Sequence, residues 1–286
     1  MSIPSHSLMN AATKKTLSPS AALKFRRLIY DHYEREGRRF PWRQTRDHYR
    51  ILVSEIMLQQ TQTNRVVEKY TEFIAAFPDI SALAGAPLRA ILSVWQGLGY
   101  NRRALCLKEL AETVAARYEG RIPGTVEELK KLPGLGPATA ASVAAFAFNR
   151  PVVFLETNIR TVFIHHFFPG KGKVSDTDIL PLAEAALDRE NPRRWYNALM
   201  DYGAMLKKTG ANPGRRSAHY TRQSPFEGSD RQIRGRILRL LTGHSSLTGN
   251  EMREKLDDDP RRVRHILDKL AQEGLVREEK KRYRIS

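Results

Sequence analysis

Apolar residues recur every three or four positions along most of the chain, which is the pattern of amphipathic helices packed around a core. The first such stretch begins at Ser18-Pro19, where a capping residue precedes a proline suited to the first helical turn, and it ends at Gly37. Further helices are predicted over 49–60, 63–74, 80–85, 87–95, 104–118, 138–148, 159–168, 177–189 and 192–206, with Thr63 capping the helix that it begins. No strand-rich region interrupts them, so this part of the chain is predicted to be all-α.

The composition changes at Lys207. Residues 207–229 are rich in glycine, proline, serine and basic side chains without apolar periodicity, which predicts a linker. Short helices over 232–241, 248–256 and 260–273, followed by alternating residues over 275–285, predict a winged-helix-like domain over 230–286. Its third helix would face a DNA groove with Arg261, Arg262 and Arg264. Winged helices also bind proteins, and this alternative stays open.

The charge balance points to a polyanionic partner. The 286 residues include 48 Lys+Arg and 31 Asp+Glu, a formal net charge of +17, in a chain that is 41% hydrophobic and therefore able to fold. Nucleic acid is the first candidate. An anionic membrane surface is the other, but no apolar stretch is long enough to span a bilayer. Residues 1–17 are predicted to be a disordered tail without the apolar core of a signal peptide, so we expect the protein to be cytoplasmic and associated with the nucleoid. We also expect it to be a monomer.

Metal and redox chemistry are limited by the cysteine count. Cys106 is the only cysteine, which excludes an intramolecular disulfide, a cysteine zinc site and a cysteine-ligated iron–sulfur cluster. The eight histidines are scattered, and the adjacent His165 and His166 point to different faces of a helix. The sequence therefore predicts no metal site made of side chains and no organic cofactor.

A glycine-containing turn lies between two predicted helices at Leu132-Pro133-Gly134-Leu135-Gly136-Pro137. The glycines allow positive φ and Pro137 suits the first turn of the next helix, so backbone N–H groups would point outward at a helix start. Such a turn can bind a phosphate, although an isolated Gly-x-Gly turn is usually only a turn. The predicted phosphate contacts are Leu132, Gly134, Leu135, Gly136, Ala138 and Thr139.

Two carboxylates occupy contrasting positions. Glu55 lies on a mostly apolar helix face, whereas Glu156 follows the extended apolar run 151–155 and precedes Thr157-Asn158, the predicted caps of the next helix. An acid on an apolar face suits a proton donor, and a carboxylate at a helix start suits an anion. Cleavage of a glycosidic bond needs one of each. Taken singly, an arginine partner for Glu55 and a simple helix-start role for Glu156 explain each residue.

Four ordered motifs carry a family resemblance. They are 54–62 (SEIMLQQTQ), 97–100 (GLGY), 132–136 (LPGLG) and 155–158 (LETN). Together they resemble the helix-hairpin-helix (HhH-GPD) DNA glycosylase superfamily, and within it the adenine glycosylases of the MutY type. The resemblance implies a two-lobed fold, with a six-helix barrel at 49–151 and a second helical lobe at 18–48 and 152–206.

The resemblance also implies roles for residues. Glu55 would be the acid, Glu156 the catalytic anion and Asn158 its support. Gln60 would enter the gap left by a flipped base, and Tyr100 would lie near the opposing base. The hairpin amides would hold a DNA phosphate, often through K⁺ or Na⁺ at the Gly134-Gly136 backbone.

The chain departs from the family pattern at several positions. Glu156 replaces an aspartate and is one methylene, about 1.5 Å, longer. The cluster cysteines of many relatives would follow Met205, where this chain has Leu206-Lys207-Lys208. The domain that reads 8-oxoguanine is replaced by the winged-helix-like segment. Ala138 occupies the place of the lysine used by members that also cut the backbone, which predicts a monofunctional enzyme without abasic-site lyase activity.

These observations predict a monofunctional DNA glycosylase of base excision repair that flips out and releases a mispaired or damaged base, with adenine as the expected leaving group. One alternative is a glycosylase for mismatched thymine or uracil, or for another modified base. A second, of another class, is a catalytically silent DNA-binding protein that senses lesions.

Overall fold

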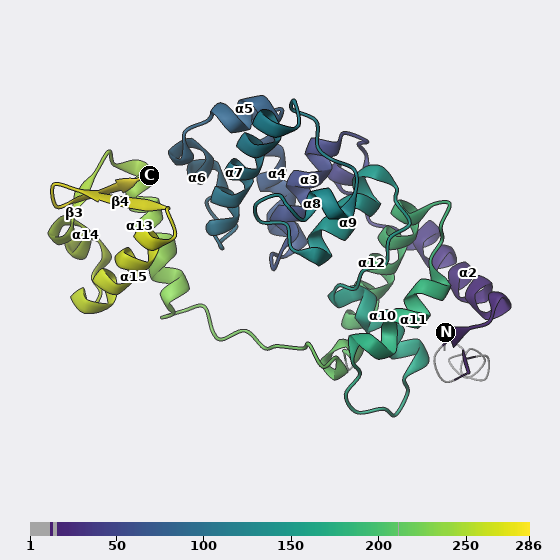
Figure 1. Ribbon diagram of the computed structural model, residues 1–286. Coiled ribbons are helices and arrows are strands. Elements are labelled where there is room, and N and C mark those ends of the chain that lie inside the picture. The colour runs from purple at the N-terminus through teal and green to yellow at the C-terminus, as the bar shows by residue number, and fades with distance from the viewer. Residues whose placement is uncertain (1–11, 14–15, 211) are drawn as a thin grey trace. The chain divides into compact units, whose positions relative to one another are not determined.

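The structure is a computed structural model that describes residues 12–13, 16–210 and 212–286. The chain forms two compact units. The first unit comprises the chain up to Phe40 together with Gly124–Val126 and Gly136–Arg222, and the second comprises Pro41–Pro123, Glu127–Leu135 and Gln223–Ser286. Helices dominate both units, which confirms the predicted all-α class (Figure 1).

The first unit is built from helices that surround an aromatic core. Phe25 lies at its centre, with the rings of Phe163 and Trp195 at centroid distances of 5.5 Å and 5.9 Å in edge-on contact. Such contacts add to the burial of large apolar rings. The elements of the unit are β1 (Ala12–Thr13), β2 (Thr16–Leu17), α2 (Pro19–Glu36), α9 (Pro137–Phe148), α10 (Thr157–Phe167), α11 (Asp176–Ala186), α12 (Pro192–Lys208) and the 3₁₀ helix η2 (Pro213–Arg216).

The second unit contains a group of helices and the C-terminal winged helix. The helical group comprises η1 (Pro41–Arg43), α3 (His48–Leu58), α4 (Thr63–Ala76), α5 (Ile80–Gly85), α6 (Leu88–Trp95), α7 (Arg102–Arg117) and α8 (Val126–Leu129). The C-terminal part comprises α13 (Asp230–Gly243), β3 (Leu247–Thr248), α14 (Gly249–Leu256), α15 (Pro260–Gln272), β4 (Val276–Glu279) and β5 (Arg282–Ile285).

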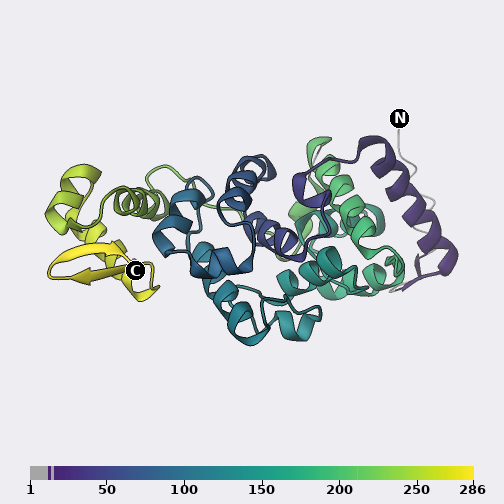
Figure 2. The same cartoon turned by 90° about the horizontal axis from the view of Figure 1, so that it is seen from above.

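The C-terminal part has the predicted winged-helix pattern. Its antiparallel strands lie in the order β3-β5-β4, and Val276 pairs with Ile285 in the hairpin, which is the yellow ribbon in Figure 2. Helix α13 packs against α6, where the Gln96 side chain donates to Thr242 Oγ1 at 2.7 Å and Arg89 donates to the Ser245 carbonyl at 2.9 Å. The winged helix is therefore attached to the helical group through α6.

Helix boundaries follow local signals closely. Ser18 caps α2 by accepting a hydrogen bond from the Ala21 amide, and Gly37 ends that helix, as predicted. The predicted capping role of Thr63 is wrong, because α4 starts one residue earlier: Gln62 is the N-cap and Thr63 is the first helical residue. Among the described helices, none is long and apolar enough to cross a membrane.

The predicted boundaries of the tail and of the linker differ from the structure. Most of the tail 1–17 lies outside the described residues, but Leu17 is buried in β2, so the ordered chain begins before Ser18. The linker does not begin at Lys207, because α12 continues to Lys208 and η2 packs on α10, with Gly214 buried. The linker is therefore confined to the residues between Ser217 and α13.

The division between lobes also differs from the prediction at α9. That helix was placed in the barrel ending at residue 151, but it groups with the first unit because it packs against α12. The core-facing residues of α9 are mostly alanines, which allow this close packing.

Candidate functional site

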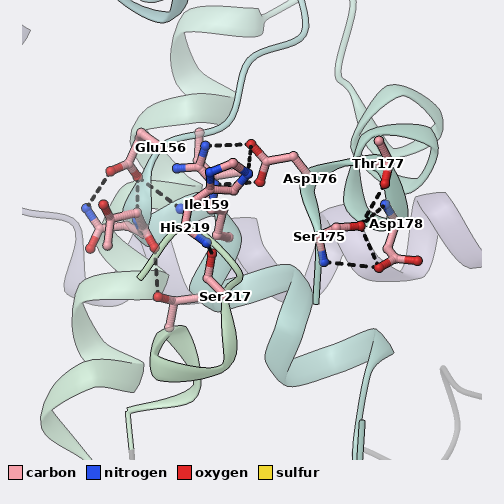
Figure 3. Close-up of polar contacts among 12 residues, drawn as sticks. Glu156, Ile159, Ser175, Asp176, Thr177, Asp178, Ser217 and His219 are labelled. Carbon is pink, nitrogen blue, oxygen red and sulfur yellow. Dashed lines mark hydrogen bonds and ion pairs between the residues drawn. The ribbon is translucent and has the colours of Figure 1, made fainter. Parts of the chain in front are cut away.

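Glu156 caps helix α10 with its own side chain. Its Oε1 accepts hydrogen bonds from the amides of Asn158 at 2.8 Å and Ile159 at 2.9 Å, and its Oε2 accepts from Asn158 Nδ2 at 3.2 Å (Figure 3). The capping role predicted for Thr157-Asn158 is therefore wrong, because the longer glutamate side chain folds back over the helix start. Three donors and the positive end of the helix dipole meet this carboxylate, an arrangement that favours negative charge.

Two groups of polar side chains lie near the start of α10 in the first unit. The Lys207 ammonium donates to Asn158 Oδ1 at 2.6 Å, so Asn158 contacts a cation on one side and a carboxylate on the other. Arg160 forms a bidentate ion pair with Asp176, both bonds at 2.7 Å, and Asp176 also lies 3.5 Å from His219 (Figure 3). The hydrogen bond from Arg160 is the main reason that the pKa of Asp176 is lowered.

Glu55 lies in the second unit, in the middle of α3. Its residue is half-buried, while the flanking Ile51, Leu52 and Ile56 are 3% exposed or less. The helix is capped by Asp47, whose side chain accepts from the Arg50 amide at 2.9 Å. The predicted apolar face around Glu55 is thus present.

Gln60 occupies a turn of restricted geometry just after α3. It is exposed and has a φ of 54°, in the left-handed region that residues other than glycine rarely adopt. Tyr100, in the next motif along the chain, also has a positive φ, 48°, and is 39% exposed. Both predicted DNA-reading side chains therefore project from strained turns.

Arg103 holds these two turns together, and sequence reasoning missed it. Its Nη1 donates to the carbonyls of Ile56, Met57 and Gln59 at 2.7 to 2.8 Å, and its Nη2 donates to Thr61 Oγ1 at 2.9 Å and the Gly99 carbonyl at 3.1 Å. Burial lowers the pKa of Arg103 to about 10, so the guanidinium stays charged at neutral pH. The signal for Arg103 in the sequence is its position on α7. Residues 103, 107, 110 and 114 lie on one face of this helix, and the last three are buried, so Arg103 continues a buried face.

The hairpin has one glycine that requires its conformation and one that does not. Gly134 has a φ of 78°, and a Cβ there would lie 2.8 Å from Cys106 Cβ. Gly136 has an ordinary φ of −71° and is the N-cap of α9, so the positive φ expected at both glycines holds only for Gly134. Gly136, Pro137 and Ala138 are exposed at this helix start, Thr139 is half-buried, and Leu132 and Leu135 are buried.

A cavity of about 760 Å³ in the second unit adjoins several predicted site residues. Gln60, Tyr100 and Gly134 line it from the helical group, and Phe226 and Arg231 line it from the C-terminal segment. The Gln223 side chain links the C-terminal segment to the helical group, because it donates a hydrogen bond to the Tyr100 hydroxyl at 2.7 Å. The volume is in the range of small-ligand sites. The contribution of the C-terminal segment was not predicted.

The predicted DNA-facing arginines of α15 differ in their contacts. Arg261 is exposed. Arg262 contacts Asp230 at 2.8 Å and the Gly228 carbonyl at 2.6 Å, and exposed Arg264 lies 3.2 Å from Asp268. Arg262 therefore helps to attach α15 to the start of α13.

Possible metal ligands do not gather in the described part of the chain, where no group of three or more His, Cys, Asp or Glu side chains is arranged to hold a metal ion. The predicted cation at the hairpin would instead be bound by backbone oxygens, which are a different kind of ligand.

Comparisons with known proteins agree with this fold and these motifs. The sequence model of the HhH-GPD superfamily of base excision DNA repair proteins matches residues 53–179. Over 268 residues the chain is 34% identical to the adenine DNA glycosylase of Mycolicibacterium smegmatis, covering 86% of this chain and 89% of that protein. The chain belongs to the HhH-GPD superfamily and is a base excision DNA repair protein.

Other relatives carry the same name. The adenine DNA glycosylase of Mycobacterium tuberculosis is 35% identical, over 73% of this chain and 75% of that protein. The adenine DNA glycosylase of Buchnera aphidicola is 34% identical over 64% of this chain. The match spans about half of that protein, 53% of its length. The predicted resemblance to the MutY-type group is thereby confirmed.

Solved structures show the same architecture. A thermostable thymine-DNA glycosylase has a TM-score of 0.60 and 28% identity, covering 67% of this chain and 90% of that one. Endonuclease III in a trapped covalent DNA intermediate has a TM-score of 0.53 at 17% identity, covering 74% of this chain and 92% of that one. The second likeness concerns the fold alone.

Proposed function

We propose that this protein is a monofunctional adenine DNA glycosylase, which flips a mispaired adenine out of duplex DNA and hydrolyses its N-glycosidic bond. The observation that carries the proposal is the Glu156 carboxylate, held by three hydrogen bonds at the start of α10, in a chain whose relatives are named adenine DNA glycosylases. A fixed anion at this point is what an oxocarbenium-like sugar requires.

Each carboxylate has a separate role in the proposed reaction. Glu55, half-buried on the apolar face of α3, delivers a proton to the leaving adenine. Glu156 stabilises the positive charge that develops on the sugar as the bond breaks, and water completes the hydrolysis. Asn158 supports Glu156 through the hydrogen bond from its Nδ2.

In the proposed base flipping, the turns that carry Gln60 and Tyr100 in the second unit contact the DNA bases. Gln60 is exposed on a turn fixed by Arg103, so it enters the gap left by the flipped adenine without a large rearrangement. Tyr100 lies beside the opposing base. The adjoining cavity, with aromatic rings at Tyr100 and Phe226 and arginines around it, suits that base and its phosphate.

The remaining contacts hold the DNA backbone. The exposed start of α9 and the Gly134 turn bind a phosphate through main-chain amides, with K⁺ or Na⁺ at the Gly134-Gly136 backbone. The basic face of α15, with Arg261 and Arg264, contacts flanking DNA. The protein acts as a monomer in the cytoplasm, on the nucleoid, and carries no iron–sulfur cluster.

Backbone cleavage is not part of this activity. The segment between Gly134 and Phe148, where an amine nucleophile would begin the second helix of the hairpin, contains no lysine. Abasic DNA is therefore expected to be released intact and to break only on treatment with alkali.

A panel of duplexes tests the proposal. Adenine is placed opposite 8-oxoguanine or guanine, thymine or uracil opposite guanine, and hypoxanthine opposite thymine, and abasic sites are then cleaved with alkali. Strand cleavage is expected for adenine and only after alkali. Lesion-selective binding without release from any duplex would overturn the enzymatic proposal and favour a lesion sensor.

A second candidate is a glycosylase for mismatched thymine or uracil. The likeness to the thermostable thymine-DNA glycosylase, at a TM-score of 0.60, favours it. Release from thymine or uracil opposite guanine with no release of adenine would select this candidate.

A further inference from the structure

Lys207 is connected to the proposed catalytic carboxylate through a single side chain. It is the penultimate residue of α12, and its half-buried side chain ends with Nζ 2.6 Å from Asn158 Oδ1. The other end of the same amide, Nδ2, lies 3.2 Å from Glu156 Oε2. The ammonium, the amide and the carboxylate thus form one chain of hydrogen bonds.

The packing of α12 on α10 explains why Lys207 reaches this place. Gly203 lies against the backbone of Asn158, and a Cβ at Gly203 would be 2.4 Å from the Asn158 carbonyl oxygen. The two helices can approach this closely only because residue 203 has no side chain. Lys207 is four residues further along α12 and therefore shares the face of Gly203. The close contact brings the ammonium to the start of α10.

Two charged groups act on Lys207 from neighbouring elements. The Glu156 carboxylate comes from the start of α10, and the Arg38 guanidinium, bound to buried Asp201, comes from the segment after α2. Helix α9 has no charged residue, and on η2 the Arg216 guanidinium is bound to main-chain carbonyls. The pKa of Lys207 is lowered by burial, with Glu156 opposing the shift and Arg38 adding to it.

We propose that Lys207 is a positioning residue, whose ammonium orients the Asn158 amide so that Nδ2 holds the Glu156 carboxylate in place for the reaction. The inference rests on the proposed glycosylase function. An amide has one donor end and one acceptor end, and an ammonium can only donate. Lys207 therefore selects the orientation in which Oδ1 faces the cation and Nδ2 faces the carboxylate. In the reverse orientation, Oδ1 would oppose the carboxylate and repel it.

The proposal gives base release a dependence on alkaline pH. While Lys207 is protonated, it imposes the productive orientation of Asn158. Once pH rises above its pKa, the neutral amine can accept as well as donate, and the selection is lost. Base release should therefore fall at alkaline pH, beginning below the ordinary range of lysine because the pKa is lowered.

Variants at two adjacent lysines separate positioning from simple charge. Lys207→Met removes the ammonium, Lys207→Arg keeps a charge that does not titrate, and Lys208→Met removes the neighbouring exposed charge as a matched control. The rate of adenine release is measured in single turnover at saturating enzyme, between about pH 6 and 10. DNA affinity is measured on a duplex with an uncleavable abasic analogue.

Lys207→Met should release adenine about tenfold more slowly, the effect of losing one charged hydrogen bond, with DNA affinity changed less than about twofold. Lys208→Met should keep the wild-type rate. Between about pH 6 and 10 the alkaline fall should be absent in both Lys207→Met and Lys207→Arg, because neither side chain titrates in this range. Equal effects of the two methionine variants, or an alkaline fall that Lys207→Arg leaves in place, would overturn the inference.

A measurement without turnover distinguishes failure of this inference from failure of the proposed function. NMR of protein with ¹³Cε-labelled lysine should show Lys207 titrating below the ordinary range of lysine, and Asn158→Ala should change the Lys207 signal only. If wild-type protein releases no base, the proposed function fails while these titrations still report the contact. If Lys207 titrates in the ordinary range of lysine, the positioning inference fails whatever the enzyme releases.

Discussion

Glu156 caps helix α10, and in the proposed reaction the same carboxylate stabilises positive charge on the sugar. It caps α10 through two main-chain hydrogen bonds, and its second oxygen accepts from Asn158. Serine, threonine, aspartate and asparagine are the usual capping residues. A glutamate in this place implies that the position of its carboxylate, and not helix capping alone, determines the residue type.

Glu156→Gln is expected to separate the two tasks. The amide oxygen can still accept from the amides of Asn158 and Ile159, so the melting temperature should change little. Loss of the negative charge should slow adenine release by at least about a hundredfold. Single-turnover release and thermal unfolding measure the two effects. Turnover within a few fold of wild type would contradict the catalytic role.

Arg103 shows how one buried cation can organise main chain. Its guanidinium donates to carbonyls at the end of α3 and in the turn at residues 97–100, where a helix end leaves main-chain oxygens with fewer helical donors. Lysine can replace it only in part, because the three donors of an ammonium lie on one nitrogen, whereas the planar guanidinium reaches both turns with donors on two nitrogens.

Arg103→Met should remove a charged donor from each of these carbonyls and lower the free energy of unfolding by about 2 to 4 kcal/mol. Arg103→Lys should recover only part of this loss. Urea denaturation measures the change, and Arg102→Met is the matched control because Arg102 is exposed in the same helical turn. An equal loss in the two methionine variants would show that Arg103 contributes only charge.

At the scale of elements, the sequence predicted those helix ends that depend on residues close to one another along the chain. Ser18 and Gly37 marked the ends of α2 correctly, because capping depends on neighbours in sequence. The Glu156 cap escaped prediction, since Thr157 and Asn158 are intrinsically better caps and only the folded side chain shows which residue acts. Lys207 escaped because its partner lies 49 residues earlier.

The hairpin yields a prediction at this scale. Gly134→Ala would strain a φ of 78° and place a Cβ 2.8 Å from Cys106 Cβ, so the turn and α7 must move apart. We expect a loss of about 1 to 3 kcal/mol in the free energy of unfolding, measured by urea denaturation. Gly136→Ala, with φ −71° and open space around it, should cost much less. Equal costs would show that the Gly134 turn is not strained by a side chain.

At the scale of the whole molecule, stability of the first unit should depend on acid pH. His166 is fully buried, and burial lowers its pKa to about 3. Its ring packs against Phe25 and Tyr202, and no described residue hydrogen-bonds to either ring nitrogen. The unfolded chain takes up a proton near pH 6.5 while the folded chain does not. The neutral ring therefore contributes full stability above pH 6.5, and this is lost as pH falls towards 3.

Between pH 7 and 4.5 the His166 contribution should fall by about 2 kcal/mol. Urea denaturation at the two pH values measures the loss, and His166→Phe should flatten the pH dependence. His265→Asn, at an exposed histidine of α15, should keep the wild-type slope. A slope that His166→Phe does not change would assign the acid sensitivity to other groups.

The order of the domains could be predicted from the sequence, but the contacts that connect their segments could not. Four sequence motifs predicted the glycosylase fold, and apolar periodicity predicted the helices and the C-terminal winged helix. Both kinds of signal come from residues that are close in sequence. The assignment of α9 to the first unit, the packing of η2 and the attachment of α13 to α6 depend on contacts between distant segments. The cavity shared by Tyr100 and Phe226 follows from that last attachment.

The interleaving of the two units has a consequence for synthesis on the ribosome. The chain leaves the first unit after Phe40, returns at Gly124 and again at Gly136, and leaves for the last time after Arg222. Neither unit is complete until its last segment has emerged, which for the second unit is the winged helix. Unfinished chains therefore display apolar helix faces for most of translation, which makes them clients for chaperones. Truncation after residue 222 should remove the packing of α13 on α6 and leave the second unit incomplete, which favours aggregation.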